Sequence, residues 1–227
     1  MPEASPRPRG RPKKPGAGAP HTARPSFERW TAVHVVLRVI PGLRSLRGCK
    51  TFRFVHRALS SGNERPGFRL VEYSVQTTHF HLIVESQSTQ SLTRAIQGLA
   101  IRLARSVNRA LRRSGAVFGD RYRSRVIRGP RDARNTLRYV LNNARRHVRF
   151  AQRNRTRWKD PCSSAPWFRR WSIPTYAPPF VPDQRYLFLT ELGSAAVAPR
   201  TALLASAWSR AGPIALLHTP GPIDSHT

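Results

Sequence analysis

The sequence predicts an α+β fold, a ferredoxin-like antiparallel sheet of the split βαβ kind with one helix added at its C-terminal end. Three observations lead to this prediction. Several short segments alternate apolar and polar residues or are rich in β-branched residues, which is typical of strands. Longer segments repeat apolar residues at helical spacing. The two kinds of segment follow one another in the order β-α-β-β-α-β-α, which is that of a split βαβ layer with a further helix.

The first half of the fold is expected to hold three strands and one helix. Turn residues such as Pro, Gly and Thr separate the segments. The last two strands are expected to pair as a hairpin, because only Thr77-Thr78 lies between them. In chain order, the predicted elements are a strand at 31–40, a helix at 50–61, a strand at 68–76 and a strand at 79–85.

The second half is expected to hold two long helices and one strand. The segment 91–114 predicts the longest helix, with Ser88 or Ser91 as its N-terminal cap and Gly115 at its end. A strand is predicted at 117–127 and a helix at 131–152, with a shorter helix at 200–210. The apolar stripe of the longest helix consists of Ile96, Leu99, Leu103, Val107 and Leu111.

The composition indicates a polyanionic partner. Forty Lys and Arg residues against eleven Asp and Glu residues give a formal net charge of +29, and a field of this strength attracts polyanions whatever the fold. Nucleic acid is the expected partner, because each neutralised phosphate releases condensed counterions. Arginine greatly outnumbers lysine, which favours bidentate contacts with phosphates and bases. There are two alternatives. The charge could reflect an arginine-rich, GC-biased genome, or the partner could be an anionic membrane surface.

Three regions are expected along the chain. Residues 1–26 are rich in Pro, Gly and basic side chains and predict a disordered basic arm. Within the arm, Gly10-Arg11-Pro12-Lys13-Lys14 resembles the core of an AT-hook, with a solvated cationic tail as the alternative. Residues 27–152 hold the predicted sheet and helices. Residues 153–227 are expected to form a Trp- and Pro-rich C-terminal extension laid on that domain.

The sequence gives no sign of a membrane segment or of a disulfide framework. No run of 18 or more apolar residues occurs, and the basic N-terminus runs into Pro and Gly rather than into an apolar signal segment. Cys49 and Cys162 lie far apart in the chain, so neither a metal cluster of cysteines nor a disulfide is expected. We therefore expect a protein of the reducing cytoplasm.

A stripe of arginines lies almost opposite the apolar stripe of the longest predicted helix. No acidic residue occurs between Glu85 and Asp120, whereas a solvated helix face normally mixes both signs. The stripe therefore predicts a phosphate-facing surface, with a solvated face as the alternative. The residues expected to contact DNA are Arg94, Arg102, Arg105, Arg109 and Arg112, together with Arg121 and with Arg11, Lys13 and Lys14 of the arm.

Two histidines and a tyrosine could carry chemistry. His79 and His81 are two apart on a predicted strand, so both side chains leave the same face and could chelate a divalent cation. Tyr139 and Asn143 are four apart, so on a helix they share one face. A tyrosine hydroxyl, with an ordinary pKa of about 10, is a poor nucleophile at neutral pH. Beside a cation that polarises a phosphate, however, it can attack and form a covalent phosphotyrosine.

Each of these residues also has a plainer interpretation. A histidine pair on a strand is often incidental. Tyr139 could be a core aromatic residue on an amphipathic helix, and Asn143 could be a surface amide. If the cation is present, Asn143 would supply an oxygen ligand to it.

The motifs resemble those of the HUH single-tyrosine transposases, and most closely those of the REP-associated tyrosine transposases. That family has a strand with His, a hydrophobic residue and His, and a later helix with Tyr-x-x-x-Asn or Tyr-x-x-x-Gln. Here the strand motif is His79-Phe80-His81 and the helix motif runs from Tyr139 to Asn143. The family's Phe-x-x-Arg-Tyr element resembles 118–122, and its downstream Trp, Pro and Ser-Ser element resembles 158–164 (WKDPCSS). The resemblance covers about residues 30–170.

Two positions depart from the family's pattern. Thr78 stands where Asn often precedes the first histidine, and Ala144 stands where Pro commonly follows the asparagine. Neither change removes a group with a direct chemical role. Both leave open a relic that binds DNA without cutting it.

The resemblance implies a metal-dependent transposase whose added helix is catalytic. His79, His81 and Asn143 would hold Mg²⁺ or Mn²⁺, and the DNA would be single-stranded beside a hairpin. Attack by Tyr139 would give a 5′-phosphotyrosine and a free 3′-OH, which can later rejoin strands. The resemblance also implies a bacterial, nucleoid-associated cytoplasmic protein that acts as a monomer or a homodimer.

Two other functions stay open at this point. One is a non-catalytic, domesticated protein that recognises hairpin DNA. The other is an RNA-binding module with a ferredoxin-like sheet, against which the sequence shows no pair of aromatic residues in the arrangement used for base stacking.

Other residues are expected to have structural roles. His34 alternates with apolar neighbours on the first predicted strand, and Cys162 has no identifiable histidine partner. Glu85 is expected either to support the metal ligands or to be a strand-end charge. Base stacking is the alternative role for three tryptophans that are expected to pack the C-terminal extension onto the sheet. They are Trp158, Trp167 and Trp171.

Overall fold

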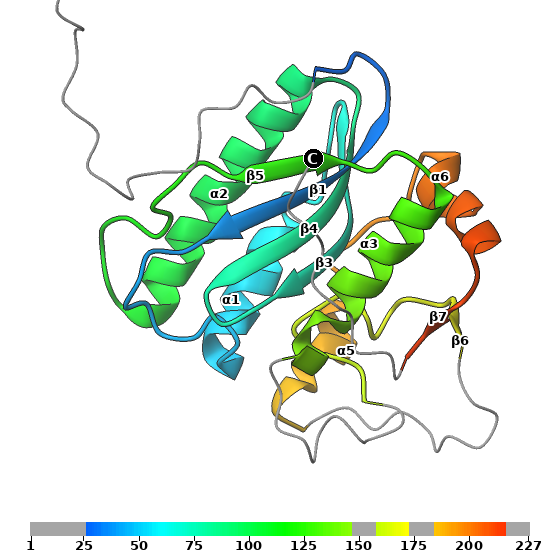
Figure 1. Ribbon diagram of the computed structural model, residues 1–227. Coiled ribbons are helices and arrows are strands. Elements are labelled where there is room, and N and C mark those ends of the chain that lie inside the picture. The colour runs from blue at the N-terminus through cyan, green and yellow to red at the C-terminus, as the bar shows by residue number, and fades with distance from the viewer. Residues whose placement is uncertain (1–25, 147–157, 173–183, 217–227) are drawn as a thin grey trace, which may run out of the picture.

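The structure is a computed structural model that describes residues 26–146, 158–172 and 184–216. Within these residues, five strands form one antiparallel sheet in the order β2-β3-β4-β1-β5 (Figure 1). Without the short β2, this is the strand order of a ferredoxin-like, split βαβ sheet, and the predicted fold class is therefore confirmed. The strands are β1 (Thr31–Arg38), β2 (Glu64–Arg65), β3 (Phe68–Val75), β4 (His79–Ser86) and β5 (Arg123–Val126).

Helices cover both faces of the sheet. α1 (Cys49–Ser60) and α2 (Thr89–Leu111) pack together on one face, behind the strands in Figure 1, and α3 (Pro130–Asn142) lies on the other. None of the described helices is long and apolar enough to span a membrane. The shorter elements are η1 (Asn143–Arg146), β6 (Trp171–Ser172), η2 (Gln184–Tyr186), α5 (Phe188–Leu192), α6 (Ala202–Ala205), η3 (Ala207–Ala211) and β7 (Ile214–Ala215).

The alternation of side chains along β4 divides the molecule into two cores. Phe80 and Leu82 enter the core beneath α1 and α2, whereas Ile83 enters the core beneath α3. The same alternation turns His79 and His81 toward α3. The sheet therefore separates the histidine pair from the layer formed by α1 and α2.

The longest helix, α2, has one of its two predicted caps but not its predicted end. The hydroxyl of Ser88 accepts the backbone N–H of Ser91, as expected for a capping serine. The helix ends at Leu111 rather than at residue 114. Arg112 itself adopts the left-handed conformation, with a φ of 50°, and closes the helix before Gly115 is reached.

Four other predicted elements are shorter than expected. The first strand ends at Arg38 rather than at residue 40, and only residues 123–126 of the strand predicted at 117–127 pair with β1, since Phe118 makes a separate bridge to Val39. α3 ends at Asn142 rather than at residue 152, because the chain tightens into the 3₁₀ helix η1. The rest of that predicted helix, from residue 147, lies outside the described residues. Ser206 divides the helix predicted at 200–210 into α6 and η3.

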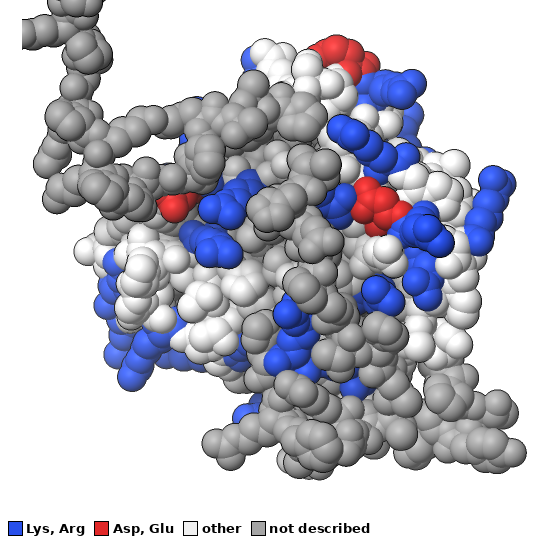
Figure 2. All heavy atoms as spheres, in the orientation of Figure 1, with Lys and Arg blue, Asp and Glu red and all other residues white. Residues whose placement is uncertain are grey.

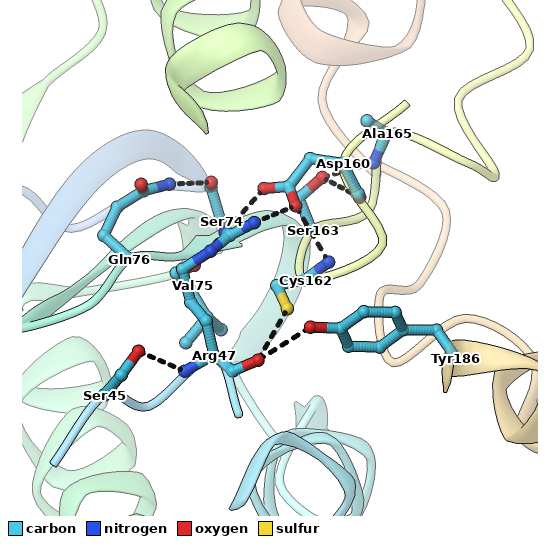
Figure 3. A network of polar contacts seen from close by, with 10 residues as sticks. All are labelled: Ser45, Arg47, Ser74, Val75, Gln76, Asp160, Cys162, Ser163, Ala165 and Tyr186. Carbon is cyan, nitrogen blue, oxygen red and sulfur yellow. Dashed lines mark hydrogen bonds and ion pairs between the residues drawn. The ribbon is translucent and has the colours of Figure 1, made fainter. Parts of the chain in front are cut away.

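Residues 162–164 of the C-terminal extension lie along the end of β3, where Cys162 and Ser163 are next to Ser74 and Val75 (Figure 3). The N–H of Val75 donates to the carbonyl of Cys162 at 2.8 Å, and Ser163 forms a bridge with Ser74. Burial raises the pKa of Cys162 to about 12, despite the nearby Arg47 guanidinium. The thiol therefore stays protonated at neutral pH, as its expected structural role requires.

A buried ion pair holds this segment in place (Figure 3). The guanidinium of Arg47 donates to both carboxylate oxygens of Asp160, at 2.6 and 3.0 Å, and to the carbonyl of Val75 at 2.7 Å. Tyr186 donates its hydroxyl to the carbonyl of Arg47 at 2.7 Å. One arginine thus joins the β3–β4 hairpin to two separate parts of the C-terminal extension.

A buried histidine in α1 should make stability depend on pH. His56 is fully buried against the rings of Phe52, Tyr73 and Trp167. Burial lowers its pKa below the ordinary 6.5, against a backbone contact with Gly193 that raises it. The folded state therefore binds fewer protons than the unfolded state. Its stability is complete above about pH 6.5 and falls as the pH drops toward the folded pKa, by at most about 1.4 kcal/mol per pH unit.

Replacement of this histidine by a non-titrating ring should remove that contribution. We expect the unfolding free energy of His56→Phe to fall less between pH 7.5 and pH 5 than that of the wild type, measured by urea unfolding. Equal slopes in the two proteins would contradict the assignment.

Candidate active site

The two histidines of β4 and the tyrosine of α3 meet on the α3 face of the sheet. The Nε2 atoms of His79 and His81 are 3.0 Å apart. The ring of Tyr139 stands edge-on to that of His81, with 5.1 Å between the ring centroids and 89° between the planes. Three residues that the sequence separates by up to sixty positions thus form one cluster within a single chain.

Asn143 lies just after Tyr139, in the first position of η1. Its side chain is buried, with 1% exposed, and neither its amide oxygen nor its amide nitrogen has a hydrogen-bond partner among the described residues. A buried amide without partners costs about 1–3 kcal/mol. A cation coordinated by the amide oxygen would remove part of this cost.

The arrangement of the histidines fits an octahedral divalent cation. Two ligands at right angles, each about 2.1 Å from one ion, are about 3.0 Å apart, which matches the separation of the His79 and His81 Nε2 atoms. No cluster of three or more His, Cys, Asp or Glu side chains placed to hold a metal exists in the described part of the chain.

His34 of β1 is a further member of the cluster, which sequence reasoning assigned to structure alone. Its Nε2 lies 3.1 Å from Nδ1 of His81, and the two rings stack with 5.3 Å between centroids. Burial, assisted by the charge of Arg125 and opposed by Asp132, lowers the pKa of His34 to about 4. The neutral ring can accept the Nδ1 proton of His81, which leaves the Nε2 lone pair of His81 available to a cation.

Two arginines modulate the acidity of Tyr139. Burial raises the pKa of Tyr139 above the ordinary 10, while Arg146, which hydrogen bonds to the phenol, and Arg38 oppose this shift. Both guanidinium groups favour the phenolate, which is the nucleophilic form. Neither arginine was predicted. Arg146 follows Asn143 so closely that the helix motif offered a signal, whereas Arg38 is placed only by the pairing of β1 with β4.

A polar brace fixes the start of α3 to the edge strand β5. Arg125 donates to both carboxylate oxygens of Asp132, at 2.7 and 2.8 Å, and to the hydroxyl of Thr136 at 2.8 Å. The backbone N–H of Arg128 donates to the same carboxylate at 3.0 Å. The brace sets the position of α3 on the sheet, and through it the position of Tyr139.

Two residues next to the histidines have different roles. The hydroxyl of Thr78, which replaces the family's common asparagine, lies 3.4 Å from Nδ1 of His79. Glu85 lies near the end of β4, which agrees with its expected role as a strand-end charge, and among the described residues its carboxylate makes no hydrogen bond to either histidine. Its buried carboxylate accepts the backbone N–H groups of Arg200 and Thr201 at 2.5 and 2.8 Å, which anchors the C-terminal extension. Four residues along a strand span about 13 Å, so Glu85 lies too far from His81.

The arginine stripe of α2 is not brought to this cluster. Arg94, Arg105 and Arg109 are exposed on the outer side of α2, and the sheet lies between them and Tyr139. Arg112 and Arg121 are exposed too, whereas Arg102 is partly buried and donates to the carbonyl of Gly98. The predicted DNA contacts Arg11, Lys13 and Lys14 lie outside the described residues.

Other arginines line the face that holds the cluster. Figure 2 shows this face, in the orientation of Figure 1, with blue and white spheres and only scattered red ones. The exposed arginines on β1, β5, α3 and the β5–α3 connection are Arg38, Arg123, Arg128 and Arg131. Sequence reasoning missed them because they are spread over short elements rather than concentrated in one stripe.

Comparison with known proteins identifies the family. Residues 31–143 match the sequence model of a family described as "Transposase IS200 like". The match begins with β1 and ends at Asn143, so it contains every member of the cluster. This part of the chain belongs to the IS200-like transposase family. The resemblance expected from the motifs is thereby confirmed, and the match supports the role of a DNA-binding transposase.

A solved structure supports the fold. It is described as "Structure of the REP associates tyrosine transposase bound to a REP hairpin" and is similar with a TM-score of 0.51 at 15% sequence identity. The similarity covers 64% of this chain and 82% of that chain. At this identity the likeness concerns the fold alone. No curated protein matches the sequence.

Proposed function

We propose that this IS200-like transposase cleaves and rejoins single-stranded DNA beside a hairpin, with Tyr139 as nucleophile and a divalent cation held by His79, His81 and Asn143. The observation that carries the proposal is the contact of Tyr139 with a pair of histidines whose Nε2 atoms lie 3.0 Å apart. Asn143, four residues after Tyr139, adds a buried amide without partners among the described residues. The hairpin substrate is suggested by the hairpin bound to the structurally similar REP-associated transposase.

The chemistry requires one bond exchange at phosphorus. The phenol oxygen of Tyr139 forms a bond to phosphorus while the bond to the 3′ oxygen breaks, and the phenol proton ends on that oxygen or in solvent. The products are a 5′-phosphotyrosine and a free 3′-OH, which can attack in reverse to rejoin a strand. A bound Mg²⁺ or Mn²⁺ would polarise the phosphate and offset its charge.

The surrounding side chains prepare this step. Arg146 hydrogen bonds to the phenol and favours its ionised form. His34 Nε2 is within hydrogen-bond distance of His81 Nδ1, and by accepting its proton would fix the tautomer of His81, as the second partner of a ligating histidine commonly does. Because Tyr139 meets histidines of its own chain, we infer that one chain can assemble the site without a partner subunit.

A labelled-strand assay tests the proposal. The full chain is incubated with Mn²⁺ and a hairpin flanked by single strands, labelled at either the 3′ or the 5′ end, and resolved on a denaturing gel. A 5′-phosphotyrosine retains the DNA downstream of the cut, so we expect label on the protein from the 3′-labelled strand alone. Hairpin binding without any adduct, across both metals and several flanking sequences, would instead support a non-catalytic hairpin-binding protein.

Removal of the proposed ligand Asn143 should weaken cation binding. We expect Asn143→Ala to lose Mn²⁺ binding by at least about tenfold, measured by calorimetry, because outer and inner ligand changes typically cost 10–100-fold or more. Asn143→Asp, which keeps an oxygen ligand, should retain it. The control is Asn142→Ala, since Asn142 donates to the carbonyl of Ala215 and serves packing. Unchanged Mn²⁺ affinity in Asn143→Ala would exclude this residue as a ligand.

The arginine stripe of α2 should supply affinity rather than catalysis. We propose that Arg94, Arg105 and Arg109 contact phosphates of the hairpin stem. Replacement of all three by Ala should lower the slope of log K against log salt concentration by about 2.7, at about 0.9 per lost phosphate contact. Adduct formation at saturating DNA should be unchanged, since the sheet separates α2 from Tyr139. Gln97→Ala on the same helix is the neutral control, and a slope equal to wild type in the triple variant would identify a merely solvated face.

A further inference from the structure

A second site of defined chemistry lies on the β3 side of α3. An open cavity of about 660 Å³, here called the Glu72 cavity, has a volume within the range of about 300–1,000 Å³ that is usual for ligand sites. Neither the histidine pair nor Tyr139 lines it. Its apolar walls include Trp167, Phe168 and Trp208 from the C-terminal extension and Leu137 from α3.

A β-bulge brings a carboxyl group into this cavity. The pairing of β3 with β4 shifts register between Leu70 and Glu72, so that Glu72, rather than Val71, lies opposite Ile83. Ile83 faces α3, and residues opposite one another in a sheet share a face. The bulge therefore directs Glu72 to the α3 side, an example of how bulges re-aim a side chain.

The environment of this carboxyl is unusual. Burial raises the pKa of Glu72 to about 8, against a hydrogen bond with Ser164 that lowers it. Among the described residues Glu72 makes no ion pair. Two arginines that line the cavity, Arg169 and Arg170, are exposed. The cavity thus combines aromatic walls, a carboxyl that lacks strong donors and guanidinium groups open to solvent.

We propose that the Glu72 cavity binds an extruded guanine of the DNA, and this inference rests on the proposed function because it takes the single-stranded substrate as its source. Guanine is the base whose Watson–Crick edge presents two adjacent N–H donors, which match the two oxygens of a carboxylate. Extruded bases are held by stacking on aromatic side chains and by contacts to this edge. The phosphates on either side of the base would meet Arg169 and Arg170.

The test compares single strands that differ in one base. Affinity of the full chain for a twelve-thymine strand with one central guanine, hypoxanthine, adenine or cytosine is measured by fluorescence anisotropy at pH 8.5, above the raised pKa of Glu72, so that its carboxyl is mostly ionised. We expect guanine to bind at least about tenfold more tightly than adenine or cytosine, since hydrogen bonds to charged groups are the strong ones. Hypoxanthine, which lacks the N2 amino group, should lose most of this advantage. Quenching of tryptophan fluorescence by the guanine strand would report on the aromatic walls directly.

Two matched variants connect the preference to one side chain. Glu72→Gln imitates the protonated carboxyl that the raised pKa indicates at pH 7, so the fold should be kept. The variant should reduce the guanine preference to less than about twofold while its affinity for the all-thymine strand stays the same. Glu64→Gln is the control, because Glu64 is an exposed carboxylate paired with Arg69 on the same sheet.

The outcomes separate this inference from the proposed function. A wild type that does not discriminate among the bases, or a guanine preference that survives Glu72→Gln, overturns the inference. If the Tyr139 adduct still forms in that case, the proposed function stands. If no single strand is bound and no adduct forms, the proposed function fails together with the inference.

Discussion

Tyr139→Phe is expected to eliminate the covalent protein–DNA adduct while leaving hairpin binding within about twofold of wild type. The substitution removes one oxygen from a side chain whose ring stays in place against His81, with 5.1 Å between the ring centroids. Loss of a nucleophile costs catalysis several orders of magnitude, about 10⁶ in a well-studied hydrolase. Binding should survive because phosphate contacts, not the phenol, supply most of the affinity.

A second tyrosine provides the matched control. Tyr122 belongs to the element that resembles the family's Phe-x-x-Arg-Tyr, and its hydroxyl lies 3.2 Å from that of Thr93 on α2. Tyr122→Phe should form the adduct at a rate close to that of the wild type. An adduct that persists in Tyr139→Phe and disappears in Tyr122→Phe would show that Tyr122, just before β5, is the nucleophile instead.

The arginines near the phenol give the same prediction a pH dependence. Burial raises the pKa of Tyr139, and Arg146 and Arg38 lower it. In the absence of Arg146 the phenol should be harder to ionise, so the rise of the cleavage rate with pH should move to higher pH in Arg146→Gln. This shift would be absent if Tyr139 were a structural ring.

The sheet and the outline of the site were predictable from sequence because each depends on local periodicity. The spacing of two between His79 and His81 on a predicted strand indicated one face of the sheet, and the spacing of four from Tyr139 to Asn143 indicated one helix face. The ends of elements were less predictable. Arg112 ends α2 in a conformation that glycine normally adopts, and η1 tightens the chain where the apolar pattern continued.

Contacts between residues on different strands could not be predicted from the sequence. His34 belongs to the cluster because β1 pairs with β4 in a register that sets Val36 opposite His81, and no local pattern fixes that register. The sequence likewise contains no pattern that predicts the β-bulge that turns Glu72 toward α3. The contact of Glu85 with the C-terminal extension was missed for a related reason, since only the course of the C-terminal extension shows that Arg200 and Thr201 reach its carboxylate.

Asp160→Ala is expected to lower the unfolding free energy by about 3–5 kcal/mol, measured by urea unfolding at pH 7. The carboxylate is 1% exposed and the Arg47 side chain 20% exposed. Burial by itself disfavours the charge of Arg47, but the adjacent Asp160 raises the pKa of the guanidinium above its ordinary value. Without the carboxylate, a buried positive charge keeps only backbone acceptors.

Two further variants show that burial, rather than the mere presence of an ion pair, sets this cost. Glu64→Ala breaks the pair with Arg69, in which the glutamate is 52% exposed, and should cost no more than about 1 kcal/mol. The double variant Arg47→Met with Asp160→Leu removes both charges and should recover much of the stability lost in Asp160→Ala. A double variant no more stable than Asp160→Ala would show that the cost lies in lost backbone contacts.

The same arginine gives the stability change a functional consequence. Arg47 donates to the carbonyl of Val75, and the turn that follows Val75 leads directly to His79. The backbone N–H groups of Leu46 and Val39 hold that turn through the carbonyls of Thr77 and Thr78. Asp160→Ala should therefore weaken Mn²⁺ binding at temperatures where the chain is still folded, whereas Glu64→Ala should not. The ion pair would then act at a distance, by fixing the hairpin that presents the first metal ligand.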